Sequence, residues 1–92
     1  MAVKTLQVTQ TGSAVQLSAT SILARWIMFQ NVAAAIQTIG DSAVTATNGY
    51  VLPALSGNVV LPPMIDGHYD LSQWWTIGTN TQKLSIVYDS MN

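Results

Sequence analysis

Short runs of alternating apolar and polar residues dominate the sequence, and they constrain the fold more than any other feature. The runs are rich in β-branched residues and are separated by glycine, asparagine, aspartate and proline. A period of two places the apolar side chains on one face of a strand, and no stretch shows a convincing amphipathic helix. The pattern therefore predicts an all-β fold of antiparallel strands.

The first two runs predict a β-hairpin with one buried face. Leu6 and Val8 alternate with polar residues in the first run, and Val15 and Leu17 do so in the second, after a turn at Thr11-Gly12-Ser13. The first run could instead be exchanged with a neighbouring chain and add a strand to the edge of that chain's sheet. Pairing within the same domain is the favoured interpretation.

The run Ala24–Gln30 differs from the others because it is apolar on both faces. Trp26 and Met28 share one side, and Ile27 and Phe29 share the other. A strand that is apolar on both faces is either central in a sandwich or buried in a subunit contact.

Four further strands are expected, at residues 33–39, 58–61, 71–77 and 82–88. The segment 33–39 begins with three alanines that would also suit a helix, but it is short and lies between strand-like runs. Seven strands without helices indicate a small antiparallel β-sandwich or a jelly-roll-like barrel. One domain is expected to span residues 1–92.

The chain carries very little charge. Only 8% of its residues are charged, whereas globular proteins average about 25%. Thr, Ser, Gln and Asn together make up about a third of the chain, and the net charge is −1. Such a surface repels copies of itself only weakly, so we interpret it as one that another protein covers. The alternative is a secreted domain with an uncharged polar coat.

Several functions are excluded by this inventory. Three basic residues that are not clustered cannot neutralise a run of phosphates, which argues against binding to nucleic acid or to an anionic membrane. No apolar stretch is long enough to span a bilayer, and no secretory signal begins the chain. Cysteine and glutamate are absent, and no nucleophile elbow or phosphate-binding loop occurs. The sequence predicts a protein that is not an enzyme and has no cofactor.

Asp66, His68 and Asp70 form the densest polar group. They could supply an acid, a base or ligands for a hard cation, but a metal site needs more ligands or a fixed geometry. A solvated loop is the favoured interpretation, and no metal site is expected.

The aromatic residues are more informative about function. Trp74 and Trp75 are adjacent, so in a strand they point to opposite faces, and both cannot lie in one core. The outward ring could be covered by a loop, contact another protein, or stack on a sugar. The candidate interface residues, among which core and interface positions are mixed, are Trp26, Phe29, Tyr69, Trp74 and Trp75.

Several segments, taken in order, carry a family resemblance over residues 12–88. They are Ala14-Val15-Gln16-Leu17, Arg25 to Phe29, the Gly-Asp-Ser to Asn-Gly segment at 40–49, a proline-flanked valine strand, Leu71-Ser72, Thr76-Ile77-Gly78 and Val87-Tyr88. In this order they resemble the small β-sandwich virion proteins of tailed bacteriophages. The sequence departs from that pattern at Ala33 to Ala35 and at Trp74-Trp75.

The resemblance implies a capsid decoration or cement protein on the surface of the virion. Such a protein would bind the assembled lattice of the major capsid protein and stabilise the head, and it could associate with copies of itself, a trimer being one arrangement. Two alternatives stay open. One is a tail, neck or baseplate component, and the other is a carbohydrate-binding module in which a tryptophan stacks on sugar rings beside Asp66, His68 and Asp70.

Overall fold

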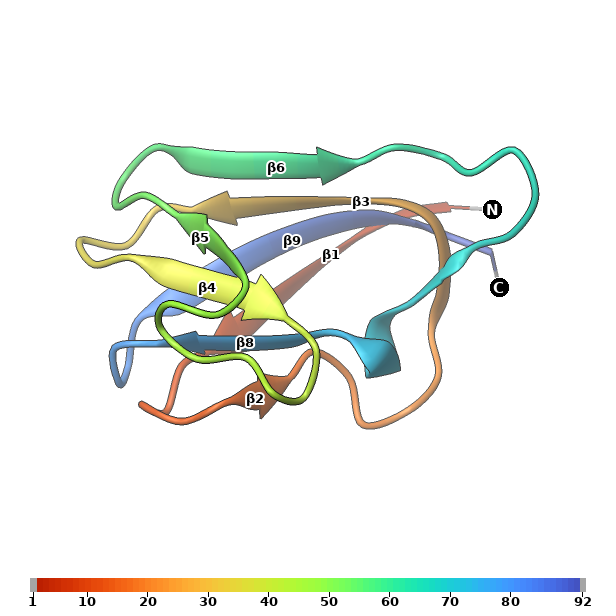
Figure 1. Ribbon diagram of the computed structural model, residues 1–92. Coiled ribbons are helices and arrows are strands. Elements are labelled where there is room, and N and C mark those ends of the chain that lie inside the picture. Colours follow the sequence, from red (N-terminus) through yellow and green to blue (C-terminus); the bar gives the residue numbers. More distant parts are fainter. Residues whose placement is uncertain (1, 92) are drawn as a thin grey trace.

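The computed structural model describes residues 2–91 and confirms the all-β prediction. Two antiparallel sheets pack face to face as a small β-sandwich (Figure 1). The elements in chain order are β1 (Ala2–Thr9), β2 (Val15–Gln16), β3 (Leu23–Asn31), β4 (Gln37–Gly40), β5 (Tyr50–Leu52), β6 (Gly57–Leu61), β7 (Tyr69–Asp70), the 3-10 helix η1 (Leu71–Gln73), β8 (Trp75–Gly78) and β9 (Lys83–Ser90).

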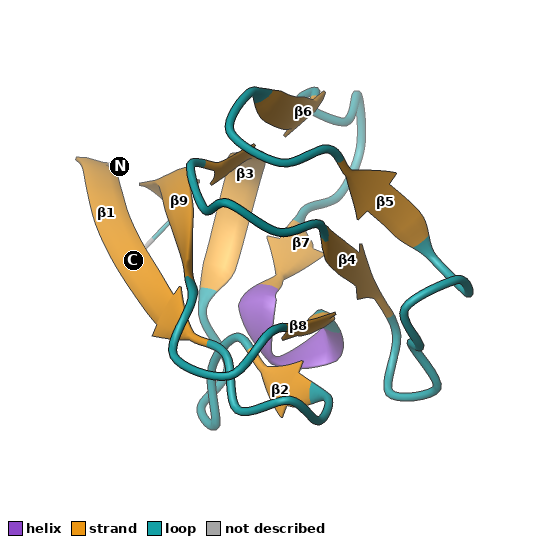
Figure 2. Ribbon diagram, turned by 90° about the vertical axis from the view of Figure 1, so that its left-hand side faces the viewer, coloured by secondary structure: helices purple, strands orange, loops and turns teal. Residues whose placement is uncertain are grey.

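The two sheets differ in size. The larger sheet has the strand order β1-β9-β3-β6, and the short β7 also pairs with β3. The smaller sheet has the order β2-β8-β4-β5. Figure 2 shows the two layers nearly end-on, with β1 at the outer edge of the larger sheet.

The predicted hairpin between the first two runs is wrong. β1 pairs with β9, whereas β2 pairs with β8 in the other sheet. The chain stays beside the β8–β9 turn as far as Gln10, whose backbone N–H donates to the Gln82 carbonyl at 2.7 Å. The turn at Thr11-Gly12-Ser13 then carries the chain from one sheet to the other. Alternation specified which face each run buries, but it did not specify the partner strand.

Three of the predicted strands are shorter than expected. The second run forms only the two residues of β2. Residues 33–36 form a bend where the chain crosses from the larger to the smaller sheet, and β4 begins only at Gln37. Residues 71–73 form η1, which is capped by the Asp70 carboxylate, and β8 follows. Residues 2–91 form nine strands instead of the seven expected, because β5 and the two-residue β7 were not predicted.

The inward residues of the alternating strands form the core, as the sequence predicts. Leu84, Ile86 and Tyr88 lie on the buried face of β9. In β3, Ile27 and Phe29 are fully buried, while Trp26 and Met28 lie on the outer face. The pairing of β3 with β9 shifts in register between Ala24 and Ile27. Because of this irregularity Ala24 and Ile27 both point inward, although regular alternation would place them on opposite faces.

A cluster of uncharged polar side chains lies inside the sandwich, and the sequence analysis did not predict it. Gln37, on the smaller sheet, donates from Nε2 to Asn31 Oδ1 at 2.6 Å and to the Lys83 carbonyl at 2.9 Å. Gln10 Nε2 donates to Gln37 Oε1 at 2.6 Å and to Thr76 Oγ1 at 3.0 Å. These bonds join the two sheets at one end of the core.

Asn31 has the most bonds in this amide cluster. Its Nδ2 donates to the carbonyls of Ala35, Leu52 and Pro53, and its Oδ1 accepts from the Ala33 N–H at 2.9 Å. Asn31 therefore holds the β3–β4 bend against the end of β5.

The amide cluster is tightly packed. A Cβ at Gly78 would lie 3.0 Å from Gln10 Cγ, so a side chain there would push into the cluster. One acceptor, Gln10 Oε1, is buried without a hydrogen-bond partner.

We predict that Asn31→Ala lowers the free energy of unfolding by about 3 kcal/mol, because it leaves several buried carbonyl and N–H groups unpaired. Chemical denaturation measures the change. Asn58→Ala is the matched control, since Asn58 is exposed on β6, and it should change stability by less than about 0.5 kcal/mol. Equal effects of the two substitutions would contradict the structural role of the amide cluster.

Candidate protein-interaction surface

The five candidate aromatic residues do not form one surface. Phe29 is fully buried in the core, and Tyr69 packs against the core while its hydroxyl donates to the Pro62 carbonyl at 2.7 Å. Trp26 is half-buried on the outer face of the larger sheet. Trp75 lies in β8 of the smaller sheet, and Trp74 lies just before it.

Trp74 and Trp75 point to opposite sides of the chain, as adjacent residues in extended backbone must. Trp74 packs against the core, with its ring centroid 5.8 Å from that of Phe29 and the two planes tilted by 44°. Trp75 lies opposite Gln16 and Gly40 on the outer face of the smaller sheet, and it is half-buried. Trp75 is therefore the outward ring of the pair.

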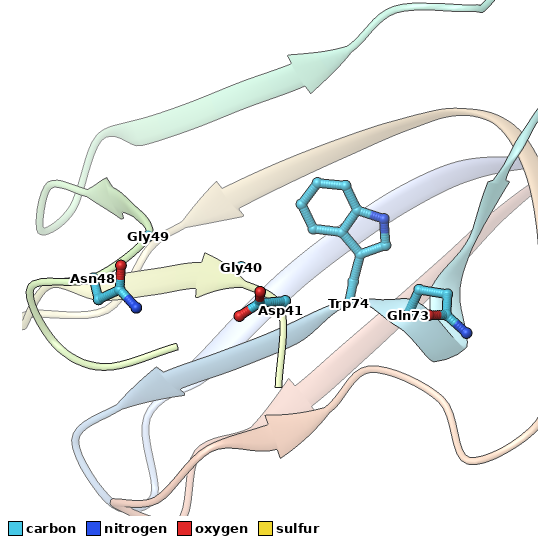
Figure 3. Close-up of a pocket in the computed structure, with 6 residues that line it drawn as sticks. All are labelled: Gly40, Asp41, Asn48, Gly49, Gln73 and Trp74. Atoms are coloured by element: carbon cyan, nitrogen blue, oxygen red, sulfur yellow. The ribbon is translucent and has the colours of Figure 1, made fainter. Parts of the chain in front are cut away.

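A hollow of about 350 Å³ lies beside Trp74 (Figure 3). Its lining residues are Gly40, Asp41, Asn48, Gly49, Gln73 and Trp74. Asp41 Oδ1 accepts from the Ala43 N–H at 2.9 Å, and Asn48 Nδ2 donates to the Ala43 carbonyl at 3.2 Å, so both side chains brace the β4–β5 loop. Figure 3 shows the Trp74 indole directed toward β3 and the Gln73 amide directed away from Asp41. The polar groups of the hollow do not converge on the ring.

The outer face of the larger sheet carries an uncharged band, bounded along β9 by Asp89 and Lys83. The strand registers align residues on it in two rows that cross β1, β9, β3 and β6. One row is Thr5, Val87, Met28 and Val60, and the other is Gln7, Ser85, Gln30 and Asn58. The two rows contain no charged residue, and Met28 and Val60 are 38% and 49% exposed. We call these eight residues the neutral face.

The sequence did not predict the neutral face, although the alternation of inward and outward residues along each strand was visible. The sequence indicated a weakly charged surface that another protein covers, but not where on the fold it lies. Their alignment across four strands depends on the pairing of β1 with β9, which the predicted hairpin excluded.

Exposed apolar side chains also lie at both ends of the sandwich. At one end, Val32 and Leu55 project from the β3–β4 and β5–β6 loops, which are joined by a bond from the Leu55 N–H to the Ala33 carbonyl. At the other end, Met64 and Ile65 are exposed in the loop between β6 and β7 (Figure 1). The molecule therefore exposes apolar groups on more than one side.

The structure does not bring Asp66, His68 and Asp70 together in one site. Asp66 and His68 are exposed in the loop before β7, whereas the Asp70 carboxylate is engaged by the backbone and by two serines. Within residues 2–91, no three His, Cys, Asp or Glu side chains are close enough together to hold a metal ion, and no helix is long and apolar enough to cross a membrane.

Hydrogen bonds hold the Asp70 carboxylate in place. Its Oδ2 accepts from Ser21 Oγ at 2.6 Å, and its Oδ1 accepts from the Ile22 N–H at 3.3 Å and from the N–H and Oγ of Ser72 at 3.0 and 2.8 Å. These bonds, that from Ser21 foremost, stabilise the ionised form and lower the pKa of Asp70 from 3.8 to about 2. The carboxylate joins the 21–22 segment to η1.

No protein-family model, no curated protein and no solved structure matches this chain. The fold and its surfaces are therefore the basis for a functional proposal.

We predict that stability falls as the pH drops from about 4 toward 2, because the pKa of Asp70 is about 2 in the folded state and about 3.8 in the unfolded state. Above this window the carboxylate is ionised in both states and its bonds contribute fully. Within it the unfolded state binds the proton first. Melting temperatures measured across pH 2–7 test the effect.

Asp70→Asn should lower the melting temperature at pH 7 and flatten its dependence on pH between 4 and 2. The exposed Asp66→Asn is the control and should leave the slope as in the parent protein. An unchanged slope in Asp70→Asn would show that other carboxylates cause the acid sensitivity.

We predict that the two tryptophans contribute differently to stability. Trp74→Ala should destabilise the fold by about 3 kcal/mol because it removes a ring that packs on Phe29, whereas Trp75→Ala should cost about 1 kcal/mol. Denaturation of both variants measures the difference, and a larger cost for Trp75→Ala would contradict the assignment.

Proposed function

We propose that this chain is a structural protein of a tailed-bacteriophage virion, a capsid decoration or cement protein. It binds the assembled lattice of the major capsid protein, associates with copies of itself and stabilises the head. It performs no catalysis. The family resemblance described above supplies the identity of the partner, and the neutral face supplies the physical basis.

The observation that carries the proposal is the neutral face of the larger sheet. Its two rows contain apolar, hydroxyl and amide groups only, so covering them requires no charge to be stripped of water. Isolated charged groups are costly to bury, whereas amides and hydroxyls can exchange water for protein partners at little net cost. A surface of this kind suits permanent contact with another protein.

The stabilising mechanism is additive. Each copy needs to bury only a modest area across a boundary between capsid subunits, because the lattice presents many equivalent sites. Where one copy contacts two subunits, the second contact benefits from a high effective concentration. Many weak bridges together oppose opening of the shell.

The carbohydrate-binding alternative has less support from the geometry. The Trp74 ring packs against the core, and the Asp70 carboxylate is held by Ser21 and Ser72, so a sugar site would have to be built around Trp75. A tail, neck or baseplate component would use the same neutral face, and the binding experiment below distinguishes it from a head protein.

We predict that the purified protein co-sediments with assembled capsid shells and not with free capsid subunits. Met28→Lys should reduce the affinity for shells at least about tenfold, since it places an unpaired charge in the centre of the neutral face. Gln73→Lys adds the same charge at an exposed position on η1 and is the matched control.

Loss of binding in Met28→Lys with retention in Gln73→Lys supports the proposal. A parent protein that binds no shell contradicts it. Binding to tail assemblies alone would assign the chain to the tail, and loss of binding in both variants would show that the neutral face is not the specific contact.

A further inference from the structure

β1 is the longest exposed strand edge in the molecule. Its eight residues pair with β9 on one side only, and Figure 2 shows no strand beyond it. The edges formed by β2 and β5 are two and three residues long, and β6 is followed by Pro62-Pro63. β1 has no proline, no bulge in its register with β9 and one charged residue, Lys4. It lacks most of the features by which proteins block unwanted edge pairing.

The backbone groups on this edge can be assigned by alternation. The Gln10 N–H donates to the Gln82 carbonyl, which continues the β1–β9 register by one residue. In an antiparallel ladder every second residue directs its N–H and C=O to the same neighbour. The even-numbered residues of β1 therefore face β9, and the odd-numbered residues direct their N–H and C=O to the open edge. These are Val3, Thr5, Gln7 and Thr9.

We propose that the open edge of β1 binds β1 of a second copy of this chain. The two strands run antiparallel, and a two-fold axis passes between the two Leu6 residues. Such an axis stands perpendicular to the sheet, so both copies keep the same face outward and residues of equal parity lie opposite each other. Val3 then pairs with the partner's Thr9, and Thr5 with the partner's Gln7. Both are hydrogen-bonded pairs of odd residues, and the dimer gains about eight backbone bonds.

The side chains fit this register. Leu6, which is half-buried beside the core, lies opposite its own copy in a non-hydrogen-bonded pair, where side chains approach most closely. On the outer face, Val3 neighbours Asp89 and Thr9 neighbours Lys83 within each copy. Pairing Val3 with the partner's Thr9 therefore gives cross-strand rows that end in opposite charges.

Self-complementarity favours a second copy as the occupant, because the register pairs the backbone groups of the edge with their own copies and places Leu6 opposite Leu6. Charge disfavours the neighbouring axis. With Leu6 on the axis, the two Lys4 residues are four strand steps apart, about 14 Å, which exceeds the Debye length of about 8 Å in physiological salt. An axis through Thr5 would bring them to about 7 Å. The dimer joins two larger sheets into one and makes their neutral faces continuous.

The test is sedimentation velocity of the isolated protein over a concentration series, which requires no capsid and so does not depend on the proposed function. The parent protein should be a monomer–dimer system. Thr5→Lys combined with Gln7→Lys places lysines opposite each other in the dimer and should weaken association at least about tenfold. Thr5→Lys combined with Gln7→Glu places opposite charges there, should retain association, and is the matched control. Thermal melts establish that both variants are folded.

Hydrogen exchange gives a second readout that is specific to this edge. The amide protons of Val3, Thr5, Gln7 and Thr9 should exchange more slowly at concentrations where the dimer forms, whereas those of the exposed loop 64–68 should not change. A strictly monomeric protein, a trimer, equal association of the two double variants, or a dimer without protection of these four amides would overturn the proposal.

Discussion

The amide cluster of Asn31, Gln37, Gln10 and Thr76 fixes the position of one sheet relative to the other. It lies where the chain twice leaves the larger sheet for the smaller one, after β1 and after β3. In an apolar interior an unpaired amide is costly, so these side chains can be buried only if both sheets are in place and in register. Apolar burial alone would tolerate sliding of one sheet over the other. The hydrogen bonds from Gln37 to Asn31 and to the Lys83 carbonyl do not.

This arrangement places the uncharged polar residues in two different roles. One set is buried and fixes the packing of the sheets, while the other set lies in rows on the neutral face. With seven charged residues in the chain, the fold has few means of keeping other proteins away from that face. A buried amide needs specific hydrogen-bond partners, whereas an exposed amide can exchange water for a protein partner at little net cost. The proposed role, permanent contact with another protein, rests on this low charge.

The sequence predicted the class of the fold and the direction of most side chains. The alternation of apolar and polar residues identified the inward residues of β9 and the two faces of β3. Because Trp74 and Trp75 are adjacent, the sequence also predicted that their rings point to opposite sides. It did not predict strand partners, because a period of two carries no information about the neighbour. The predicted hairpin failed for this reason, and the neutral face, which depends on β1 pairing with β9, was missed with it.

The amide cluster was also missed, although one signal was present. Asn31 continues the alternation of Ile27 and Phe29 and therefore occupies an inward position, but a polar residue at the end of a strand is commonly exposed. Gly78 leaves room for Gln10, but a glycine in the sequence does not by itself indicate a buried polar neighbour. Among the candidate interface residues, the structure assigns Phe29 to the core, packs Trp74 and Tyr69 against it, and leaves Trp26 and Trp75 on outer faces.

The proposed function places this domain in a protein shell. A density map of purified virions that encode the chain tests it most directly. The account predicts sandwich-shaped density on the outer surface of the head where major capsid subunits meet, with the larger sheet's neutral face against protein. Heads without such density, or density in which the neutral face is turned to solvent, would contradict it.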